Sequence, residues 1–348
     1  MKYIRIRLLK ERLSFLVELK SLWIIGILLA MTMVAILISA GLGDARVSPL
    51  QVANVLLGGG DDFNRLVVLD FRMPRILIAL FVGIGLSVAG AILQAMVRNP
   101  LASPDIIGIT AGASLSVVAF LALFSDENNS LTVSIQWLPV AAFIGALVAT
   151  ILVYVFSWKE GVAPLRLILI GIGISALLDA FKTMFMILGP IYQASQANIW
   201  ITGTVNGSNW SQVVIIAPII IALCGIAFFS ARHLTVQELG DDVVIGLGNR
   251  LQQQRLLLLL VSTALVGTAV AFAGGIGFVG LIAPHMARRI VGSSYGALLP
   301  TSAFLGALLV MVADLIGRTL FLPLEVPAGV FTAAIGAPYF IYLLTRSK

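Results

Sequence analysis

Arg72-Met-Pro-Arg75 opens the stretch of sequence that decides the fold, an uncharged run from Ile76 to Val97 follows, and Arg98-Asn-Pro-Leu-Ala102 closes it. A helix that crosses a membrane needs about 20 mostly apolar residues, and the run has this length. Basic residues flank both of its ends, and the Asn-Pro turn separates it from the next apolar run. The stretch therefore predicts a membrane crossing with basic residues at both of its ends.

The composition extends this interpretation to the whole chain. Of the 348 residues, 59% are hydrophobic and 11% are charged, and the mean hydropathy is +1.06. Soluble domains carry roughly 25% charged residues. Backbone groups in hydrocarbon must find partners within their own segment, so the spans must be helices, and the long apolar runs lack the alternation of a transmembrane barrel. We predict an all-α polytopic membrane protein with about ten transmembrane helices.

The chain divides into a short arm and one membrane domain. Residues 1–21 form a basic cytoplasmic arm, and residues 22–348 form a single transmembrane domain with a long polar insertion at residues 233–254. The first apolar run exceeds the core of a signal peptide, which predicts an uncleaved first span. The span at 277–291 is short and follows two glycines, so a broken or re-entrant element stays open. The predicted spans cover residues 22–42, 74–97, 105–124, 137–157, 166–188, 211–230, 255–273, 277–291, 299–320 and 328–345.

The basic residues set the orientation of these spans. With the N-terminus inside, sixteen of the 22 Lys and Arg residues fall on cytoplasmic segments, five fall outside and Lys182 lies within a span. Positive charge is concentrated on the cytoplasmic side of membrane proteins, so both termini are predicted to be cytoplasmic. This distribution also accounts for the net charge of +6 without a nucleic-acid partner.

Nucleotide and metal chemistry have little support in the sequence. A Walker A loop needs a Gly-Lys pair, and the chain contains none. Gly275-Ile-Gly-Phe-Val-Gly280 fits the spacing of a dinucleotide-binding loop, but it begins a membrane helix, so small residues that let helices approach closely are the better interpretation. His233 and His285 have no Cys or carboxylate at ligand spacing. We therefore expect a protein that is not an enzyme, binds no metal and holds no cofactor of its own.

Two charged pairs lie within the predicted spans. Asp179 and Lys182 are three residues apart, and Asp314 and Arg318 are four residues apart, so each pair can form along its own helix. An ion-coupled carrier usually has unpaired acidic residues near the middle of the membrane. Self-pairing favours a structural role for these charges, and a carrier driven by an ion gradient stays as an alternative.

Three outer arginines, Arg72, Arg75 and Arg318, depart from the inside-positive distribution. Arginine at a helix end often extends its charged group to the membrane surface, which would give these residues a structural role alone. The other interpretation is a basic rim that attracts acidic residues of a partner. Spacing alone leaves both interpretations open.

The polar insertion has an amphipathic sequence. Gly240 and Gly248 divide it into two short helical segments. An ordinary surface loop is one interpretation, and a pair of helices inserted into a groove of a partner is the other. The apolar residues that share a rough stripe are Leu234, Val236, Leu239, Val243 and Leu247.

A series of short motifs runs along nearly the whole chain. It comprises Arg72-x-Pro-Arg75, Gly90-x-x-x-Gln94, Arg98-Asn-Pro-Leu-Ala102, Gly275-x-Gly-Phe-Val-Gly-Leu281, Pro284-His285-x-x-Arg288, Asp314-x-x-x-Arg318, Glu325-x-Pro-x-Gly329 and Ile335-Gly-Ala-Pro338. Through these motifs, in this order, the chain resembles the permease subunit of bacterial ABC importers for ferric siderophores, haem and cobalamin. The resemblance extends from Pro49 to Leu344 and covers the N-terminal arm poorly.

The resemblance implies a type II ABC importer permease fold with ten helices. It implies a dimer around a central translocation path, formed by two copies of the chain or by two related permeases. Two cytoplasmic ATPase subunits, which use the ATP, would bind below. An extracytoplasmic substrate-binding protein with acidic docking residues would bind above.

The resemblance also assigns roles to residues by their position in the motifs. Binding-protein docking falls on the three outer arginines, Arg72, Arg75 and Arg318. A cytoplasmic gate falls on Asn99 and Leu101. A second gate segment would fall near residues 163–165, and it stays unassigned because the small hydroxyl residues common in the family are absent there. The ATPase-coupling helices fall on Leu234, Val236, Leu239, Gly240, Val243, Leu247 and Gly248.

We therefore expect the permease subunit of an ATP-driven importer, located in the bacterial cell membrane as a multi-pass protein. Ferric siderophores are the expected cargo, with haem and cobalamin as alternatives. The cargo would pass through the path without covalent chemistry, while ATP is hydrolysed in the partner subunits. A secondary carrier driven by an ion gradient is the rival from a different class.

Overall fold

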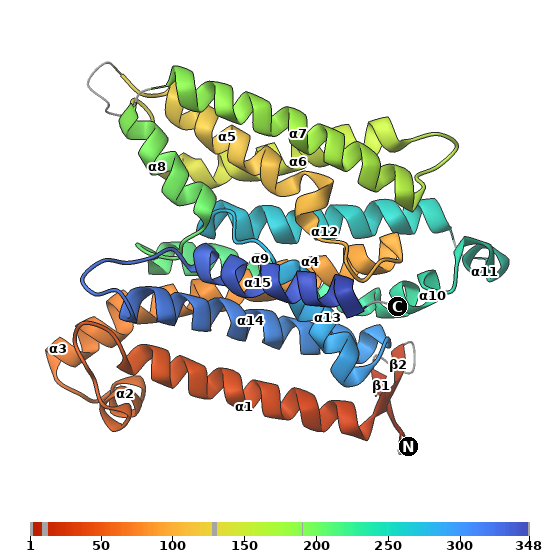
Figure 1. Ribbon diagram of the computed structural model, residues 1–348. Helices are drawn as coiled ribbons and strands as arrows, with labels where there is room; N and C mark the ends of the chain where they lie inside the picture. Colours follow the sequence, from red (N-terminus) through yellow and green to blue (C-terminus); the bar gives the residue numbers. More distant parts are fainter. Residues whose placement is uncertain (1–2, 9–12, 127–130, 190, 249, 347–348) are drawn as a thin grey trace.

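Long helices that lie side by side and run along one direction dominate the structure (Figure 1). It is a computed structural model that describes residues 3–8, 13–126, 131–189, 191–248 and 250–346. Within these residues, eight helices are long and apolar enough to cross a membrane. The apolar helix α5 (Ile109–Leu123) is shorter, as is α13 (Val279–Val291), which has basic residues in its last turn.

Each of the ten predicted spans coincides with a helix, which confirms the fold class. The short span predicted at 277–291 is α13, which begins after an irregular connection at 274–278. The longer spanning helices are α1 (Leu19–Gly41), α4 (Met73–Val97), α6 (Leu138–Ser157), α7 (Pro164–Leu188), α9 (Trp210–Phe229), α12 (Leu251–Ala273), α14 (Tyr295–Thr319) and α15 (Ala328–Arg346).

The two ends of this bundle carry different elements. The two chain ends lie at one end, together with α10 (Ala231–Gln237) and α11 (Asp241–Gly246) (Figure 1). The helices α2 (Pro49–Leu56) and α3 (Asp62–Arg65) lie at the opposite end. This arrangement agrees with cytoplasmic termini, so we name the two ends the cytoplasmic end and the outer end.

Helix α4 lies at the centre of the bundle, because glycines let its neighbours come close. It contacts α14, α12, α13 and α9. A β-carbon placed on Gly83 would lie 2.3 Å from the carbonyl oxygen of Gly306 on α14. One placed on Gly90 would lie 1.8 Å from the carbonyl oxygen of Gly280 on α13. Small residues of this kind let the backbones of membrane helices approach, and most of α4 is buried as a result.

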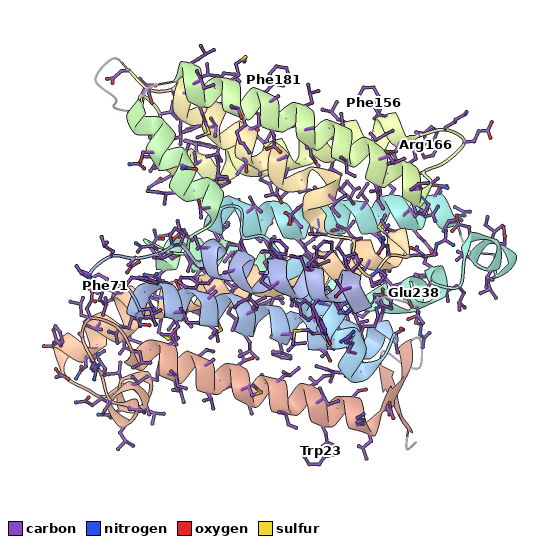
Figure 2. The ribbon with its side chains drawn as sticks, viewed as in Figure 1. Trp23, Phe71, Phe156, Arg166, Phe181 and Glu238 are labelled. Carbon is purple, nitrogen blue, oxygen red and sulfur yellow. The ribbon has the colours of Figure 1, made fainter. Side chains whose placement is uncertain are left out.

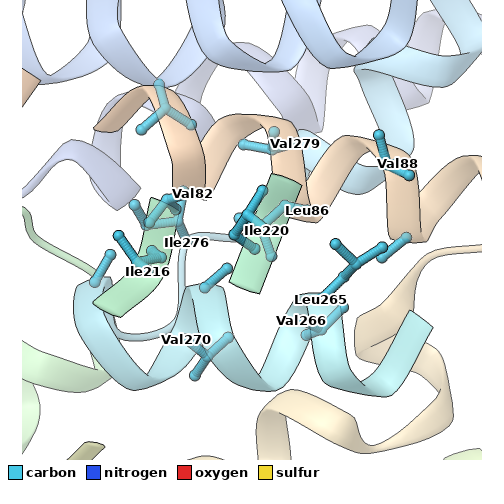
Figure 3. Close-up of a cluster of buried hydrophobic side chains, with 14 of the residues drawn as sticks. Val82, Leu86, Val88, Ile216, Ile220, Leu265, Val266, Val270, Ile276 and Val279 are labelled. Atoms are coloured by element: carbon cyan, nitrogen blue, oxygen red, sulfur yellow. The ribbon is translucent and has the colours of Figure 1, made fainter. Parts of the chain in front are cut away.

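Branched aliphatic side chains fill the space between α4, α9 and α12 (Figure 3). Val82 and Leu86 come from α4, Ile220 comes from α9 and Leu265 comes from α12, and all four are buried. Helices in a membrane gain little from leaving lipid, so close van der Waals packing holds them together.

A π-helical segment leads into the outer end of α4. This segment, η1 (Leu66–Arg72), joins α3 to α4 without a break. Pro74 is the second residue of α4 and has no backbone N–H to donate to η1. The last residue of η1 is Arg72, and Arg75 lies within the first turn of α4.

The glycine-rich sequence before α13 makes close backbone contacts. A β-carbon on Gly275 would lie 2.7 Å from the carbonyl oxygen of Ile201, and one on Gly280 would lie 2.9 Å from that of Leu86. Ile201 belongs to α8 (Ile191–Thr202), a helix on the outer side that hydropathy did not predict. The interpretation of these glycines as sites of close helix approach is confirmed.

The N-terminal arm forms a two-stranded hairpin that the all-α prediction did not include. Strands β1 (Tyr3–Leu8) and β2 (Leu13–Glu18) pair antiparallel, with Tyr3 opposite Glu18 and Leu8 opposite Leu13. The first strand alternates Ile and Arg, a period of two that is typical of a strand. Helix α1 begins at Leu19, so the predicted boundary of the arm at residue 21 lies inside the first turn of α1.

Aromatic side chains on the outside of the bundle point away from it (Figure 2). Trp23 on α1, Phe156 on α6 and Phe181 on α7 are exposed examples. Soluble proteins rarely expose large contiguous apolar surfaces. Such a surface around long apolar helices is expected of a chain that spans a membrane several times.

Candidate functional site

The three outer arginines line one cavity at the outer end of the bundle. Arg72, Arg75 and Arg318 come from η1, α4 and α14, and they border a space of about 560 Å³. Asn206 and Glu325 line the same cavity. The residues predicted as a set are therefore brought together, although Arg318 is far from the other two in the sequence.

Two of these arginines bind the end of α1. Arg72 Nη1 donates a hydrogen bond to the carbonyl oxygen of Ala40 at 2.7 Å. Arg318 Nη2 donates to the carbonyl oxygen of Ser39. The last four carbonyl groups of a helix lack partners inside it, and a cation near them is favourable because the helix dipole is negative there.

Backbone donors satisfy the other two terminal carbonyls of α1. The N–H of Leu42 donates to the carbonyl oxygen of Ile38 at 3.0 Å, and that of Val47 donates to the carbonyl oxygen of Gly41 at 3.0 Å. All four carbonyls from Ile38 to Gly41 thus have a donor. The two arginines are part of the cap that ends α1.

This cap removes Arg72 and Arg318 from the surface. They are 7% and 6% exposed, respectively. The sequence suggested a basic rim, whereas these two guanidinium groups point into the protein toward main-chain oxygens. Their part in binding-protein docking stays a prediction.

Arg75 lies at the centre of an ion-pair network. Its Nη2 is 2.8 Å from Asp314 Oδ1, and its Nη1 is 3.0 Å from Glu325 Oε2. The predicted pairing of Asp314 with Arg318 is present, with 3.7 Å between Oδ2 and Nε. Arg75 is nevertheless the closer partner of Asp314, across 239 residues of sequence.

The accessible positive charges of the outer end lie on other residues. Arg46, between α1 and α2, and Arg65, the last residue of α3, are both exposed. Neither forms an ion pair with another residue that the structure describes. Both are among the five basic residues that the predicted topology places outside, but the exposure that singles them out depends on the fold.

The polar insertion forms two short helices at the cytoplasmic end, as predicted. Gly240 separates α10 from α11 with a φ of 108°, and Gly248 follows α11 with a φ of 76°. Both values lie in the region that favours glycine. Leu239 and Leu247 are 65% and 63% exposed, and Val243 is also exposed.

The predicted apolar stripe is wrong for its first residue. Leu234 is fully buried, because α10 packs against α14 and α4. Val236 is only half-buried. The predicted stripe assumes one continuous helix, but the backbone breaks the helical period at Gly240. The exposed apolar patch consists of Leu239, Val243, Ile245 and Leu247. The predicted stripe did not include Ile245.

The turn after α4 has a defined local geometry. Arg98 ends α4 in the left-handed region with a φ of 54°. Asn99 Oδ1 accepts a hydrogen bond from the N–H of Leu101 at 2.9 Å, as in an Asx-turn. Asn99 also lines a cavity of about 210 Å³ together with Glu238 and Arg288. The predicted gate residues therefore lie beside the segment predicted to couple to the ATPase.

Comparisons of the sequence with known proteins point to one group. A family model described as the FecCD transport family matches residues 31–346. The chain is 54% identical to the "Probable siderophore transport system permease protein YfhA" of Bacillus subtilis (strain 168), covering 98% of this chain and 99% of that protein. It is 38% identical to the ferric enterobactin transport system permease protein FepG of Escherichia coli (strain K12), covering 88% and 90%.

Comparison with solved structures agrees with the sequence comparisons. A metal-chelate type ABC transporter in an inward-facing conformation matches with a TM-score of 0.84 and 30% sequence identity. The match covers 93% of this chain and 99% of the solved chain. The arrangement of helices described above is therefore shared along nearly the whole length.

Proposed function

The chain belongs to the FecCD transport family, and we propose that it carries ferric siderophores across the cell membrane. It is a permease subunit of a bacterial ABC importer, a multi-pass membrane protein and a transport subunit rather than an enzyme. Membership of this family implies ATPase subunits, a binding protein and a second permease as partners.

Sequence identity with relatives of known name, over nearly the full length of the chain, supports the choice of a ferric siderophore as cargo. The relative named for siderophore transport shares 54% of its residues with this chain across 98% of the chain. The relative named for ferric enterobactin and one named for iron(3+)-hydroxamate import, at 41% identity, also align over most of the chain. These names have ferric iron in an organic chelate in common, which supports a ferric siderophore over haem or cobalamin.

We assign the binding protein to the outer end. Arg75 and Glu325 lie at the outer cavity, while Arg46 and Arg65 present accessible positive charge near it. Acidic residues on a binding protein would be steered toward such charges. Arg72 would act indirectly, because it fixes the end of α1 under this surface.

We assign the ATPase subunits to the opposite end. The exposed patch of Leu239, Val243, Ile245 and Leu247 suits a hydrophobic groove, since short apolar helices commonly bind partners in this way. ATP binding and hydrolysis in the partner would displace α10 and α11. The gate at Asn99 and Leu101 would then open and close the path, and no bond of the cargo would be made or broken.

Uptake by reconstituted vesicles tests this function. The vesicles contain this permease with its candidate ATPase, binding protein and any second permease, and they are offered labelled ferric siderophore, haem or cobalamin. We expect ATP-dependent uptake of the ferric siderophore that requires every component. Preferred uptake of haem or cobalamin would overturn the choice of cargo.

The same vesicles test the rival class of transporter. Permease alone is given a proton or sodium gradient without ATPase subunits. We expect no uptake, because the charged pairs within the spans bind one another. Uptake driven by the gradient alone would identify a secondary carrier and contradict the ABC importer mechanism.

A further inference from the structure

Two carboxylates on the coupling segment, residues 231–246, bind arginines that belong to the helix bundle. Glu238 caps the end of α10, and Asp241 opens α11. Figure 2 shows Glu238 at the cytoplasmic end, beside α10. Each carboxylate contacts two other parts of the chain, so the coupling segment is fastened to the bundle at two points.

The first point is a cluster around Asp241. Its Oδ1 lies 3.0 Å from Arg98 Nη2 and 2.7 Å from Arg255 Nη2. Arg98 ends α4 and directly precedes the predicted gate residue Asn99, while Arg255 lies in α12. Arg255 Nη1 also donates to the carbonyl oxygen of Val162 at 2.8 Å. One carboxylate oxygen therefore connects α11 to α4, to α12 and, through Arg255, to the loop before α7.

The second point is a cluster around Glu238. Its Oε1 lies 2.6 Å from Arg288 Nη1 and accepts a hydrogen bond from the Tyr295 hydroxyl at 3.0 Å. Arg288 Nη2 donates to the same hydroxyl at 2.9 Å. Arg288 belongs to α13, and Tyr295 is the buried first residue of α14. The three groups form a closed triangle that connects α10 to two further helices.

The backbone of Arg98 supports a switching role for the first cluster. Its φ of 54° and ψ of 36° are left-handed, a conformation in which the β-carbon crowds the backbone and which is unfavourable for an arginine. Glycine is usual at this position of a helix end. Conformations of this kind persist where surrounding contacts hold them, and they are frequent in switch regions. The ion pair with Asp241 is such a contact.

The accessibility of the Arg98–Asp241 pair argues against a role in stability alone. The side chains of Arg98 and Asp241 are 36% and 35% exposed. Ion pairs this open to water add little to folding stability, although they still fix the relative positions of the elements they join. The turn at Asn99 borders a cavity of about 210 Å³, which gives it space to move.

We propose that Asp241 and Glu238 are positioning residues that transmit a displacement of the coupling segment to the gate turn, residues 98–101. The inference rests on the proposed function, because it requires an ATPase that moves α10 and α11. When α11 moves, Asp241 draws Arg98 and Arg255 with it, so the end of α4 and the start of α12 shift together. Glu238 passes the same displacement to α13 through Arg288.

The ratio of cargo transported to ATP hydrolysed tests this proposal. Asp241→Asn removes the charge and keeps the size of the side chain. In vesicles with all subunits, we expect the labelled ferric siderophore taken up per ATP to fall by roughly tenfold, a typical size for coupling between two sites. The rate of ATP hydrolysis should change by less than about twofold, because the ATPase still binds its apolar patch.

The adjacent acidic residue provides a matched control. Asp242 is exposed and forms no ion pair with another described residue, so Asp242→Asn should keep the wild-type ratio. An unchanged ratio in Asp241→Asn overturns the proposal. An equal loss in both variants also overturns it, because the lost charge would then act at the ATPase contact rather than within the cluster.

Two further variants separate transmission from assembly. Asp241→Glu keeps the carboxylate and should recover most of the ratio, which a simple packing role would not predict. Glu238→Gln tests the second cluster and should lower the ratio even where Asp241→Asn fails to assemble with the ATPase. A normal ratio in Glu238→Gln would contradict the part assigned to Glu238.

The wild-type protein in the same vesicles distinguishes this inference from the proposed function. If the wild type takes up no ferric siderophore with ATP, the proposed function and this inference both fail. If the wild type is active and all the variants keep its ratio, only the positioning role fails.

Discussion

Arginine residues at the outer end have different roles, although they share a residue type and a side of the membrane. Arg72 and Arg318 donate to main-chain oxygens, Arg75 binds two carboxylates, and Arg46 is exposed. A guanidinium group carries five donors in a planar fork and can bind carbonyls as well as carboxylates. The neighbours that the fold provides therefore decide the role of each residue.

Removing the cap of α1 should destabilise the chain. Arg318→Ala takes away the donor to the carbonyl oxygens of Ser39 and Leu42. A buried polar group that loses its partner costs about 1–3 kcal/mol, so we expect the free energy of unfolding in detergent to fall by that amount. Arg46→Ala, at an exposed position, serves as the control and should leave the unfolding midpoint unchanged. Equal midpoints for both variants would contradict the capping role.

Reversing the accessible outer charges should weaken binding-protein docking without affecting folding. We expect the double variant Arg46→Glu with Arg65→Glu to slow association with the binding protein by roughly tenfold at low salt. The difference should shrink as salt is added, since the screening length at 0.1 M is about 10 Å. Surface-immobilised binding protein and permease in nanodiscs would give the rates.

A charge reversal at the cytoplasmic end is the matched control for docking. Lys159→Glu, in the exposed loop before α7, should leave the association rate unchanged. If the Arg46 and Arg65 double variant also associates at the wild-type rate, these two residues have no part in docking. Charge reversal at Arg72 or Arg318 cannot isolate docking, because it would also break the cap of α1.

Residue roles were predictable from the sequence where a pair lies on one helix, and not where it joins distant helices. Asp314 and Arg318 are four residues apart, so their pairing was readable from helical spacing. The closer contact of Asp314 with Arg75 depends on the packing of α14 against α4. Leu234 shows the same limit, since only the packing of α10 reveals that it is buried.

At the scale of elements, the contact of α4 with α13 depends on two glycines. A β-carbon on Gly90 would lie 1.8 Å from the carbonyl oxygen of Gly280. Gly90→Ala should therefore push the helices apart and lower the free energy of unfolding by about 1–3 kcal/mol, the usual effect of overpacking. Gly26→Ala on α1 is the control, because no described atom lies within 4 Å of its β-carbon position. Thermal unfolding that ranks Gly26→Ala below Gly90→Ala would refute this account.

Helix α7 contains the second charged pair that the sequence predicted. Lys182 and Asp179 form an ion pair along the helix, which confirms that prediction. An unpaired charge near the centre of a membrane helix costs about 2.5–3.5 kcal/mol, so Asp179→Ala should reduce the amount of protein inserted in the membrane.

A double variant tests the reason for this loss. Asp179→Ala combined with Lys182→Met removes both charges and should restore insertion to near the wild-type level. The amount of protein in the membrane fraction is measured for the wild type, the two single variants and the double variant. These four values give the coupling between Asp179 and Lys182. Additive effects of the two substitutions would show that the pair does not contribute to insertion.

Hydropathy predicted the spanning elements well and the short elements poorly. A long apolar run can be recognised from composition, because the thickness of the bilayer sets its length. Helix α8 and the N-terminal hairpin are shorter, and neither has to cross hydrocarbon. Their structure follows from contacts that composition does not reveal, such as the backbone of α8 against the distant Gly274 and Gly275.

At the scale of the whole molecule, α4 connects the two candidate sites. Arg75 lies near its outer end beside the large cavity, and Arg98 ends it beside the coupling segment. The helix has 25 residues, and a helix of that size is about 37 Å long. The motifs at its two ends predicted both sites from sequence, while the ion pairs around them required the fold.

Helix α1 has a consequence for how the chain is made. It leaves the ribosome long before α14, yet α14 is its main neighbour, and Arg318 reaches it across 276 residues of sequence. Translation proceeds at about 5–20 residues per second, so α14 follows on the order of tens of seconds later. During that interval α1 lies in the bilayer without α14, and the carbonyl oxygens of Ser39 and Leu42 lack the donors that Arg318 supplies. The packing of α1 is therefore completed late in biogenesis, when α14 has been synthesised and Arg318 binds the end of α1.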